Sequence, residues 1–586
     1  MLVLALVTKT SEICAGVCQK PGLACKPCRT WRSAALAGAL SLTALLAPET
    51  ALACGGFFCS STQPVNQAAE RIVFAQNSDG TVTAVIEIMY EGPSENFSWL
   101  LPISSVPMGD DIAVSSNAAF QRLQAATNPQ YQLTVRVEGT CDDGGSNRGG
   151  GLAVPGSASS DNDSGSGPGG VTVEASGAVG AFEWTAISLD PALDDPAAAA
   201  VEWLEANGYD VPEGAPGLLG PYLDDGMYLL ALRLQKGRDT GSIRPIVLTY
   251  DAARPMIPIK LTSVAANENM GVMTWILGDG QAVPQNYNAL ELNEARINWF
   301  NPSANYDQVV IAAADEAGGQ GFVTEYAQPT SALAQPVWSQ FDESEWETFR
   351  TSMYSPEQLY AESTWRYASF DGFWDVVQAN GTLTVPLEQA QQCPDCYPVT
   401  GLDAQGFLAG LETEVIEPVR LVQRLIDEHP QITRMYTTLS ADEMTVDPLF
   451  TFNDTLTSVS NIHQAERVIE CRSSYTQDQA PWRIELPSGG VIRGIGSNVG
   501  TWPAVFDAQP ANQRVMRQGE TGAGQVLEDN TSTIQQALSD YNETVPGSGD
   551  DSDGCSINGK QGAPRLAWLA VGALWWLGRR RRRQQS

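Results

Sequence analysis

Residues 71–88 read RIVFAQNSDGTVTAVIEI, and this stretch sets the kind of fold that the chain adopts. Two runs of apolar and β-branched residues, 72–75 and 82–88, flank the polar segment 77–80. An Asp-Gly pair between two such runs is typical of a hairpin turn. The stretch therefore predicts two antiparallel strands.

The residues on the C-terminal side of this hairpin also favour strands. Residues 131–137 alternate apolar and polar side chains, which predicts a strand with one buried face. Further strands are predicted over 99–103, 171–174, 227–234, 246–250, 257–261 and 272–277. Residues 142–170 are rich in Gly, Ser and Asp and predict a flexible loop between strands. A helix is predicted over 196–207, capped by Asp195.

The pattern changes in the second half of the chain. Helices are predicted over 342–354, 370–379, 403–417 and 419–428, the last two meeting at Pro418. Gly406 and Gly410 weaken the third of these predictions. Strands return at 468–471 and 483–486, and a capping box at Ser532 predicts a short final helix. The fold class expected is α+β, with a strand-rich first half and a mixed second half.

Composition and charge exclude several classes of protein. The chain has 586 residues, 43% of them hydrophobic, and a formal net charge of −34, so it is neither disordered nor collagen-like. The basic residues gather at both ends, which leaves a charge of −44 between residues 54 and 554. Such a body repels nucleic acid and anionic lipid and attracts divalent cations or cationic partners. The plainer interpretation is a solvated acidic shell.

The N-terminal residues 1–53 have the pattern of an export signal. Arg29 and Arg32 precede an apolar stretch over 34–47, and Ala51-Leu52-Ala53 provides a small-residue cleavage site that leaves Cys54 first. A lipoprotein signal that acylates Cys54 is the alternative, although Ala51 stands where Leu is normal. Four further cysteines precede the signal: Cys14, Cys18, Cys25 and Cys28. Their spacing is compatible with a zinc site. The alternative is that the start codon is placed too far upstream, so that this segment is not part of the protein.

The C-terminal residues 546–586 predict a linker and an anchor. An acidic linker over 546–554 leads to Gly554-Cys555, an apolar run over 566–578 and five arginines. This layout resembles the MYXO-CTERM class of bacterial sorting signals. The resemblance implies that sorting machinery recognises and processes the tail over 555–586 and leaves the protein on the cell surface. A plain tail anchor in the membrane, with the arginines in the cytoplasm, predicts the same orientation.

The exported body, residues 54–545, contains six cysteines, and an even number in an exported chain favours disulfides. The candidates are Cys54, Cys59, Cys141, Cys393, Cys396 and Cys471. Local pairing joins Cys54 to Cys59 and Cys393 to Cys396, which leaves Cys141 with Cys471. Cys393-Pro394-Asp395-Cys396 also has the spacing of a redox motif, yet its surroundings favour a loop over the helix start that such a motif needs.

Several motifs resemble an uncharacterised family of exported bacterial proteins, the domain of unknown function numbered two-three-three-zero. They are the segments Cys54-Gly55-Gly56-Phe57-Phe58-Cys59, Tyr90-Glu91-Gly92-Pro93, residues 96–102 and residues 436–444. The likeness extends from residue 54 to about residue 480. It implies an exported protein without a known activity, so it assigns no catalytic residue.

No known catalytic motif is complete. His429 and His463 are the two histidines, and each stands in a plain context. The carboxylate pairs Asp224-Asp225 and Asp442-Glu443 are the candidates for glycosidase-like chemistry. Four tryptophans of the second half predict either core packing or a carbohydrate-binding face: Trp338, Trp346, Trp365 and Trp374.

We therefore expect an exported, surface-anchored envelope or interaction protein, with no cofactor and no metal site. The partners expected are the export and sorting machinery and the membrane, contacted through the C-terminal helix; divalent cations are further candidates, and nucleic acid is excluded by charge. The alternatives are an extracellular hydrolase that uses paired carboxylates and a thiol-disulfide enzyme at Cys393 and Cys396.

Overall fold

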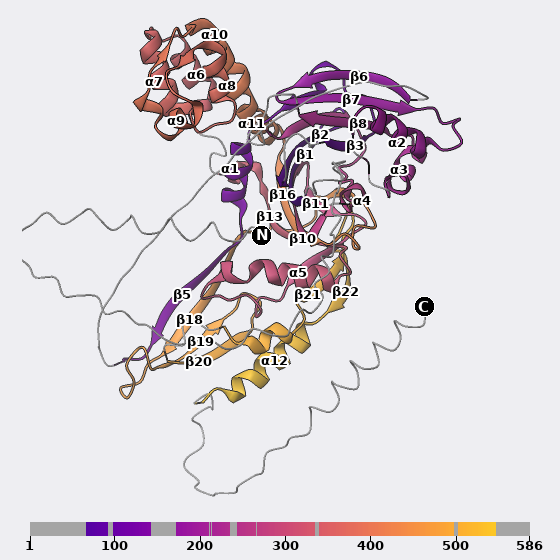
Figure 1. Ribbon diagram of the computed structural model, residues 1–586. Helices are drawn as coiled ribbons and strands as arrows, with labels where there is room; N and C mark the ends of the chain where they lie inside the picture. The colour runs from indigo at the N-terminus through magenta and orange to yellow at the C-terminus, as the bar shows by residue number, and fades with distance from the viewer. Residues whose placement is uncertain are drawn as a thin grey trace, which may run out of the picture. The chain divides into compact units, whose positions relative to one another are not determined.

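The computed structural model describes residues 66–91, 98–141, 171–209, 211, 214–234, 243–264, 266–333, 339–496 and 502–546. Helices and strands are mixed along this part of the chain, and the strands form several sheets (Figure 1). The fold is therefore mixed α/β. The predicted export signal over 1–53 and the predicted sorting signal over 555–586, with Gly554 and Cys555, lie outside the described residues.

The largest sheet has ten strands, and the first hairpin lies within it. Its order is β22 (Gln525–Asp529), β21 (Asn512–Arg517), β12 (Asn288–Leu292), β13 (Gly321–Pro329), β16 (Gln431–Leu439), β10 (Ala266–Gly278), β1 (Asn66–Gln76), β2 (Thr81–Glu91), β9 (Ile246–Asp251) and β4 (Ile112–Val114). β1 pairs antiparallel with β2 and parallel with β10. A chain segment of nearly two hundred residues therefore separates two neighbouring strands.

The predicted hairpin between β1 and β2 is confirmed. The backbone N–H of Asn77 donates to the carbonyl oxygen of Thr81 at 2.9 Å, which closes the turn. Gly80 has φ of +91°, in the left-handed region that glycine enters without a steric penalty. A residue with a Cβ at this position would strain the turn.

A second sheet packs on one face of the large sheet. It has the order β3 (Ser98–Ile103), β8 (Tyr228–Leu234), β7 (Phe182–Leu189) and β6 (Val171–Val179). Ile72 and Phe74 of β1 share a hydrophobic core with Leu101 and Ile103 of β3. The outer face of this second sheet packs against α2 (Pro196–Ala206) and α3 (Ala215–Asp224). The helix predicted over 196–207 is confirmed as α2.

The opposite face of the large sheet is covered by helices. Val73 and Ala75 of β1 are buried with residues of α1 (Asn117–Thr127) and α11 (Glu417–Glu428). β1 is thus buried on both faces, and successive side chains enter different cores because a strand alternates its side chains. This alternation positions the site described below.

A third sheet has the order β20 (Val491–Ile495), β19 (Pro481–Glu485), β18 (Ile462–Glu470) and β5 (Gln130–Glu138). The prediction that one face of β5 is buried is wrong for its second half. Tyr131 packs against the core, whereas Val135 and Val137 are 57% and 46% exposed. The reason is that burial of a strand face depends on what packs against it, and apolar alternation does not reveal where that packing ends.

The strand predicted over 257–261 is also wrong, because most of that segment forms the short helix α4 (Ile259–Thr262). Ile257 and Ile259 are fully buried, and a short apolar run looks the same in a buried strand and in a buried helix. Pro258 has no N–H for a strand ladder, whereas it is tolerated just before a helix. The N–H of Lys260 at the helix start donates to Asp447 Oδ1 at 3.0 Å.

Helices dominate residues 339–428, as predicted. They are α6 (Glu343–Arg350), α7 (Pro356–Tyr367), α8 (Phe373–Asn380), α9 (Leu387–Gln392), α10 (Ala404–Leu411) and α11. α10 and α11 are joined by a π-helical turn over Glu412–Ile416, and Pro418 lies in the first turn of α11 instead of separating two helices. A Cβ on Gly410 would lie 2.8 Å from Val376 of α8. The glycines that weakened this prediction allow two helices to approach closely.

The remaining elements complete the sheets and their cover. They are α5 (Tyr306–Glu316), α12 (Thr531–Thr544), and the pairs β11 (Gln281–Pro284) with β17 (Phe450–Asn453) and β14 (Thr382–Leu383) with β15 (Val399–Thr400). The final helix begins at Thr531 after Asn530, so the predicted cap at Ser532 is displaced into the helix. Among the described residues, no helix has the length and apolar character needed to cross a membrane.

Two disulfides lie in the described part of the chain, Cys141–Cys471 and Cys393–Cys396. Both are pairs named from the sequence, whereas Cys54 and Cys59 lie outside the described residues. The first pair joins the ends of β5 and β18 across a sequence separation of 330 residues. The second encloses a separation of three residues.

We expect the two disulfides to contribute very different amounts to stability. A cross-link reduces the entropy of the unfolded chain more when it closes a longer loop. Replacing Cys141 and Cys471 together by serine should lower the free energy of unfolding by about 4 kcal/mol in a denaturant titration. The double serine variant at Cys393 and Cys396 is the matched control and should lose less than half as much. Equal losses would contradict this account.

Candidate functional site

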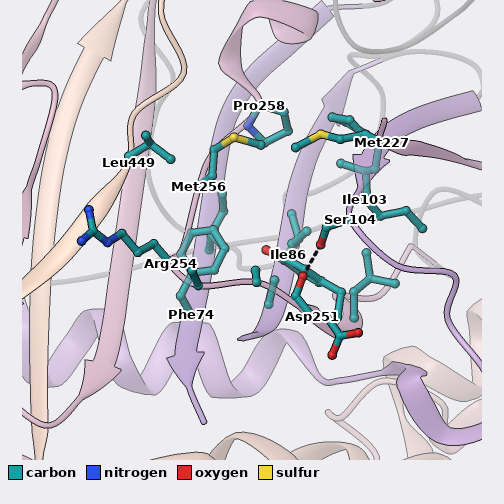
Figure 2. Close-up of a pocket in the computed structure, with 18 of the residues that line it drawn as sticks. Phe74, Ile86, Ile103, Ser104, Met227, Asp251, Arg254, Met256, Pro258 and Leu449 are labelled. Atoms are coloured by element: carbon teal, nitrogen blue, oxygen red, sulfur yellow. Dashed lines mark hydrogen bonds between the residues drawn. The ribbon is translucent and has the colours of Figure 1, made fainter. Parts of the chain in front are cut away.

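An apolar cavity of about 480 Å³ lies where the large sheet meets the second sheet (Figure 2). Side chains from β1, β2 and β9 form one wall, and residues 101–104 of β3 and the turn after it form another. The lining is mainly aliphatic and aromatic: Ile72, Phe74, Ala84, Ile86, Leu101, Pro102, Ile103, Met227, Leu248, Tyr250, Ala252, Ala253, Met256, Pro258 and Leu449. A cavity of this size and character is typical of a small-molecule site.

The strand register explains why the cavity forms here. Ile72 pairs with Ile86, and Phe74 pairs with Ala84, so these side chains point from the large sheet toward β3. Ala84 is the small member of this set, and it leaves space beside the Phe74 ring that larger neighbours would fill. Ala84 is thus one of the small residues that leave space here, together with Ala252 and Ala253 after β9.

Methionines surround one end of the cavity. Met227 precedes β8, and Met256 precedes α4 (Figure 2). Both side chains are unbranched and have three rotatable bonds, so they adapt to ligands of different shapes. This end of the cavity can therefore accommodate a variable apolar group.

Polar groups occur at another part of the lining. The hydroxyl of Ser104 donates to the backbone oxygen of Asp251, which ties the end of β3 to the end of β9 (Figure 2). Arg254 forms an ion pair with Glu520 at 2.5 Å and also donates to Gln285. The cavity therefore has an apolar interior and a polar rim.

Glu70 is the unusual member of the lining. It stands on the face of β1 that carries Ile72 and Phe74, and it is 4% exposed. Its Oε2 atom has no hydrogen-bond partner in the part of the chain that the structure describes. Burial raises the pKa of Glu70 to about 7. Near neutral pH this carboxyl is therefore protonated in a large share of the molecules and can donate a hydrogen bond.

The alternation of β1 explains why Arg71, the neighbour of Glu70 in the sequence, does not pair with it. The next residue, Arg71, points to the other face of the sheet, where its Nε lies 2.5 Å from Glu87 Oε2. Arg71 and Glu87 are direct partners in the β1–β2 register, whereas Glu70 is opposite Ile88. The nearest cation along the chain thus pairs with a different carboxylate, and Glu70 is left in apolar surroundings.

The carboxylate pairs that the sequence singled out do not line this cavity. Asp224 and Asp225 are exposed at the end of α3. Glu443 accepts a hydrogen bond from the Ser440 backbone N–H at 2.8 Å, so it stabilises the turn after β16, and Asp442 beside it is exposed. Neither of these two carboxylate pairs belongs to the lining of the cavity.

The two histidines have separate structural roles. The ring of His429 lies 2.7 Å from the Leu425 oxygen and 3.1 Å from the Gln76 oxygen, and so links the end of α11 to the end of β1. His463 stacks on Tyr131 and lies 3.3 Å from Glu294. Glu294 also accepts from the Ser488 backbone N–H at 3.0 Å, so it holds a turn.

The Cys393–Cys396 motif follows the short helix α9 and forms a three-residue 3-10 turn. The sequence indicated a loop before this motif, and the structure places a helix there. A catalytic motif of this spacing stands instead at the start of a longer helix, whose N-terminus stabilises the thiolate. Over the described ranges, no cluster of three or more His, Cys, Asp or Glu side chains is arranged to hold a metal ion.

A family model described as an uncharacterized protein conserved in bacteria (DUF2330) matches residues 48–343, which is half of the chain. The chain belongs to the DUF2330 family. The DUF2330 match contains the whole lining of the cavity except Leu449. The match ends before residues 436–444 and before the expected limit of the likeness at about residue 480. Neither a search of curated proteins nor a search of solved structures finds a match.

Glu70 and the methionines were not among the site residues expected from the sequence. The available signal was a single acid at position 70 in a strand whose alternate positions, 72 and 74, are large and apolar. Such an acid points into the core unless the strand is solvated on that face. Recognising it as part of a site also requires the second sheet, whose strands come from 98–103 and 171–234.

We expect Glu70 to make stability depend on pH. Its folded-state pKa of about 7 lies above its ordinary value of 4.5, so the folded protein binds more protons between these values than the unfolded chain does. The free energy of unfolding should therefore fall by about 3 kcal/mol as the pH rises from 4 to 8. In Glu70→Gln this contribution should be absent.

Denaturant titrations of both proteins from pH 4 to pH 8 measure this difference directly. Taking the difference between wild type and Glu70→Gln cancels the contributions of all other groups. Glu205→Gln, on the exposed side of α2, is the matched control and should have wild-type stability at each pH. A difference between wild type and Glu70→Gln that stays constant with pH would show that Glu70 is not held in apolar surroundings.

Proposed function

We propose that this DUF2330 protein is an exported envelope protein that binds an amphipathic small molecule in the cavity between β1–β2 and β3. The observation that carries the proposal is the combination of an apolar cavity with a buried carboxyl whose Oε2 atom has no hydrogen-bond partner among the described residues. The cavity favours a hydrocarbon portion, and the carboxyl favours a polar atom on the same ligand.

The apolar lining supplies the affinity. Each buried methylene contributes about 0.8 kcal/mol, so a chain of about ten methylenes contributes about 8 kcal/mol before the cost of immobilisation. Methionine side chains at one end tolerate chains of different length. The ligand class that fits is therefore an acyl or alkyl chain and not a compact polar metabolite.

Glu70 supplies the orientation. A buried polar group without a partner costs free energy, and a ligand atom that satisfies it recovers that cost. A protonated carboxyl both donates and accepts, which matches the carboxyl, ester or hydroxyl head of an amphipathic molecule. The head would then lie beside β1, with the chain extending along Phe74 toward the methionines.

Export and anchoring are a separate part of the proposal. Support comes from the signal pattern over 1–53, the tail over 555–586 and the two disulfides. The partners implied are the export and sorting machinery and the membrane. Because the body carries a large negative charge, it repels nucleic acid and attracts divalent cations, which are candidates for loose association. Binding is preferred to hydrolysis, because neither carboxylate pair lines the cavity.

A fluorescent amphipath tests the ligand proposal. Dansyl-undecanoic acid should bind the purified full chain with enhanced emission, and Met227→Trp, which fills one end of the cavity, should weaken binding at least about tenfold. Met353→Trp is the matched control, because Met353 is fully exposed and does not line the cavity. Absence of binding, or equal binding by both variants, would contradict the proposal.

Surface labelling tests the location. In cells that express the full chain, an impermeant amine-reactive reagent should label the protein, and alkylation before reduction should find Cys141 and Cys471 blocked. The physical reason is that these thiols oxidise outside the cytoplasm. An unprocessed chain in the cytosol with free thiols would exclude export without deciding whether the cavity binds a ligand.

A further inference from the structure

Trp365 is exposed to an unusual degree for so large an apolar side chain. It is 78% exposed, whereas Trp346 in the neighbouring helix is fully buried. Trp374 is half-buried, and its indole N–H donates to the Ala368 oxygen at 3.1 Å. Trp338 lies outside the described residues. Core packing thus explains Trp346 and Trp374, and it leaves Trp365 without a packing role.

Trp365 lines a surface groove of about 660 Å³, which we name the α7 groove. The groove is lined by Glu357, Tyr360, Ala361, Glu362, Trp365, Tyr397, Pro398 and Val399. Glu357, Ala361 and Trp365 are four residues apart along α7, so they share one face of that helix. One wall of the groove is therefore a helix face that carries both a carboxylate and an indole.

The opposite wall is held in place by several constraints. Gln389 Nε2 donates to the Tyr397 hydroxyl at 2.8 Å, and Val399 pairs with Leu383 in the short sheet β14–β15. The Cys393–Cys396 disulfide closes the turn directly before Tyr397. These constraints make the α7 groove a preformed site, so ordering the groove on binding costs little free energy.

The charged groups in the lining are both negative, namely Glu357 and Glu362, and the rest of the lining is aromatic or apolar. Carboxylates attract cations, and an indole face attracts them through its quadrupole. Arg366, the next residue of α7, lies outside the lining; its guanidinium is 5.4 Å from the Phe349 ring centroid, 5.8 Å from the Trp365 ring centroid and 4.0 Å from Glu362. A second cation on the open side of the groove would find the same kind of environment.

We propose that the α7 groove is a docking site for an extended, arginine- or lysine-containing segment of a partner polypeptide. Trp365 would stack on a basic side chain, and Glu357 and Glu362 would accept its hydrogen bonds. Pro398 and Val399 would contact the apolar stem of that side chain. The net charge of −34 adds a long-range attraction for the same class of partner. The groove lies beyond the residues that the family model matches, and this proposal is independent of the cavity.

The test uses the full chain and a fluorescein-labelled octapeptide of alternating arginine and glycine, at 0.15 M salt. Fluorescence anisotropy should show saturable binding, and the same peptide with glutamine in place of arginine should bind at least tenfold more weakly. Trp365→Ala should raise the Kd about twofold to fivefold. These side chains are exposed, so the variants should remain folded, which circular dichroism checks.

A matched pair of charge variants separates the groove from the general acidity of the chain. Glu357→Gln/Glu362→Gln should raise the Kd about tenfold. Glu202→Gln/Glu205→Gln, on exposed positions of α2, removes the same charge and should change the Kd less than twofold. Equal effects of the two pairs, an unchanged Kd in Trp365→Ala, or binding of a neutral oligosaccharide in preference to the peptide would each overturn the proposal.

Discussion

The burial of β1 on both faces is the constraint on which the described site depends. Successive side chains of this strand enter two different cores, so neighbours in sequence have unrelated surroundings. Arg71 forms an ion pair with Glu87 of β2 on the face of the sheet that the helices cover, and Glu70 lies on the face that the second sheet covers. If one face of the sheet were solvated, Glu70 would be an ordinary surface acid. The second layer of strands buries it, and its Oε2 atom has no hydrogen-bond partner among the described residues.

Local features of the fold were predictable because local physics determines them. The hairpin at residues 77–80 and the Asp195 cap of α2 each depend on contacts within a few residues. The edge position of β5 and the helical form of residues 259–262 were not predictable, because both depend on what packs against the segment. The same distinction applies to the cavity, since the sequence shows the apolar positions 72 and 74 but not the strand that faces them.

The two proposed binding surfaces differ in the physics that they use. The cavity near Glu70 offers removal of apolar area from water and a buried hydrogen-bonding group in a mainly apolar lining. The α7 groove offers carboxylates and an exposed indole in contact with solvent, where attraction is weaker and depends on salt. A hydrophobic small molecule and a basic polypeptide can therefore bind the same chain without competing for the same groups.

The parallel pairing of β5 with β18 has a consequence for how the chain folds. Residues 130–138 pair with a strand that lies more than three hundred residues later in the sequence, and Cys141 is likewise 330 residues from Cys471. During synthesis, this edge of β5 stays unpaired until most of the polypeptide has been made. Contacts between residues so far apart in the sequence slow folding, because a long loop must close before they form.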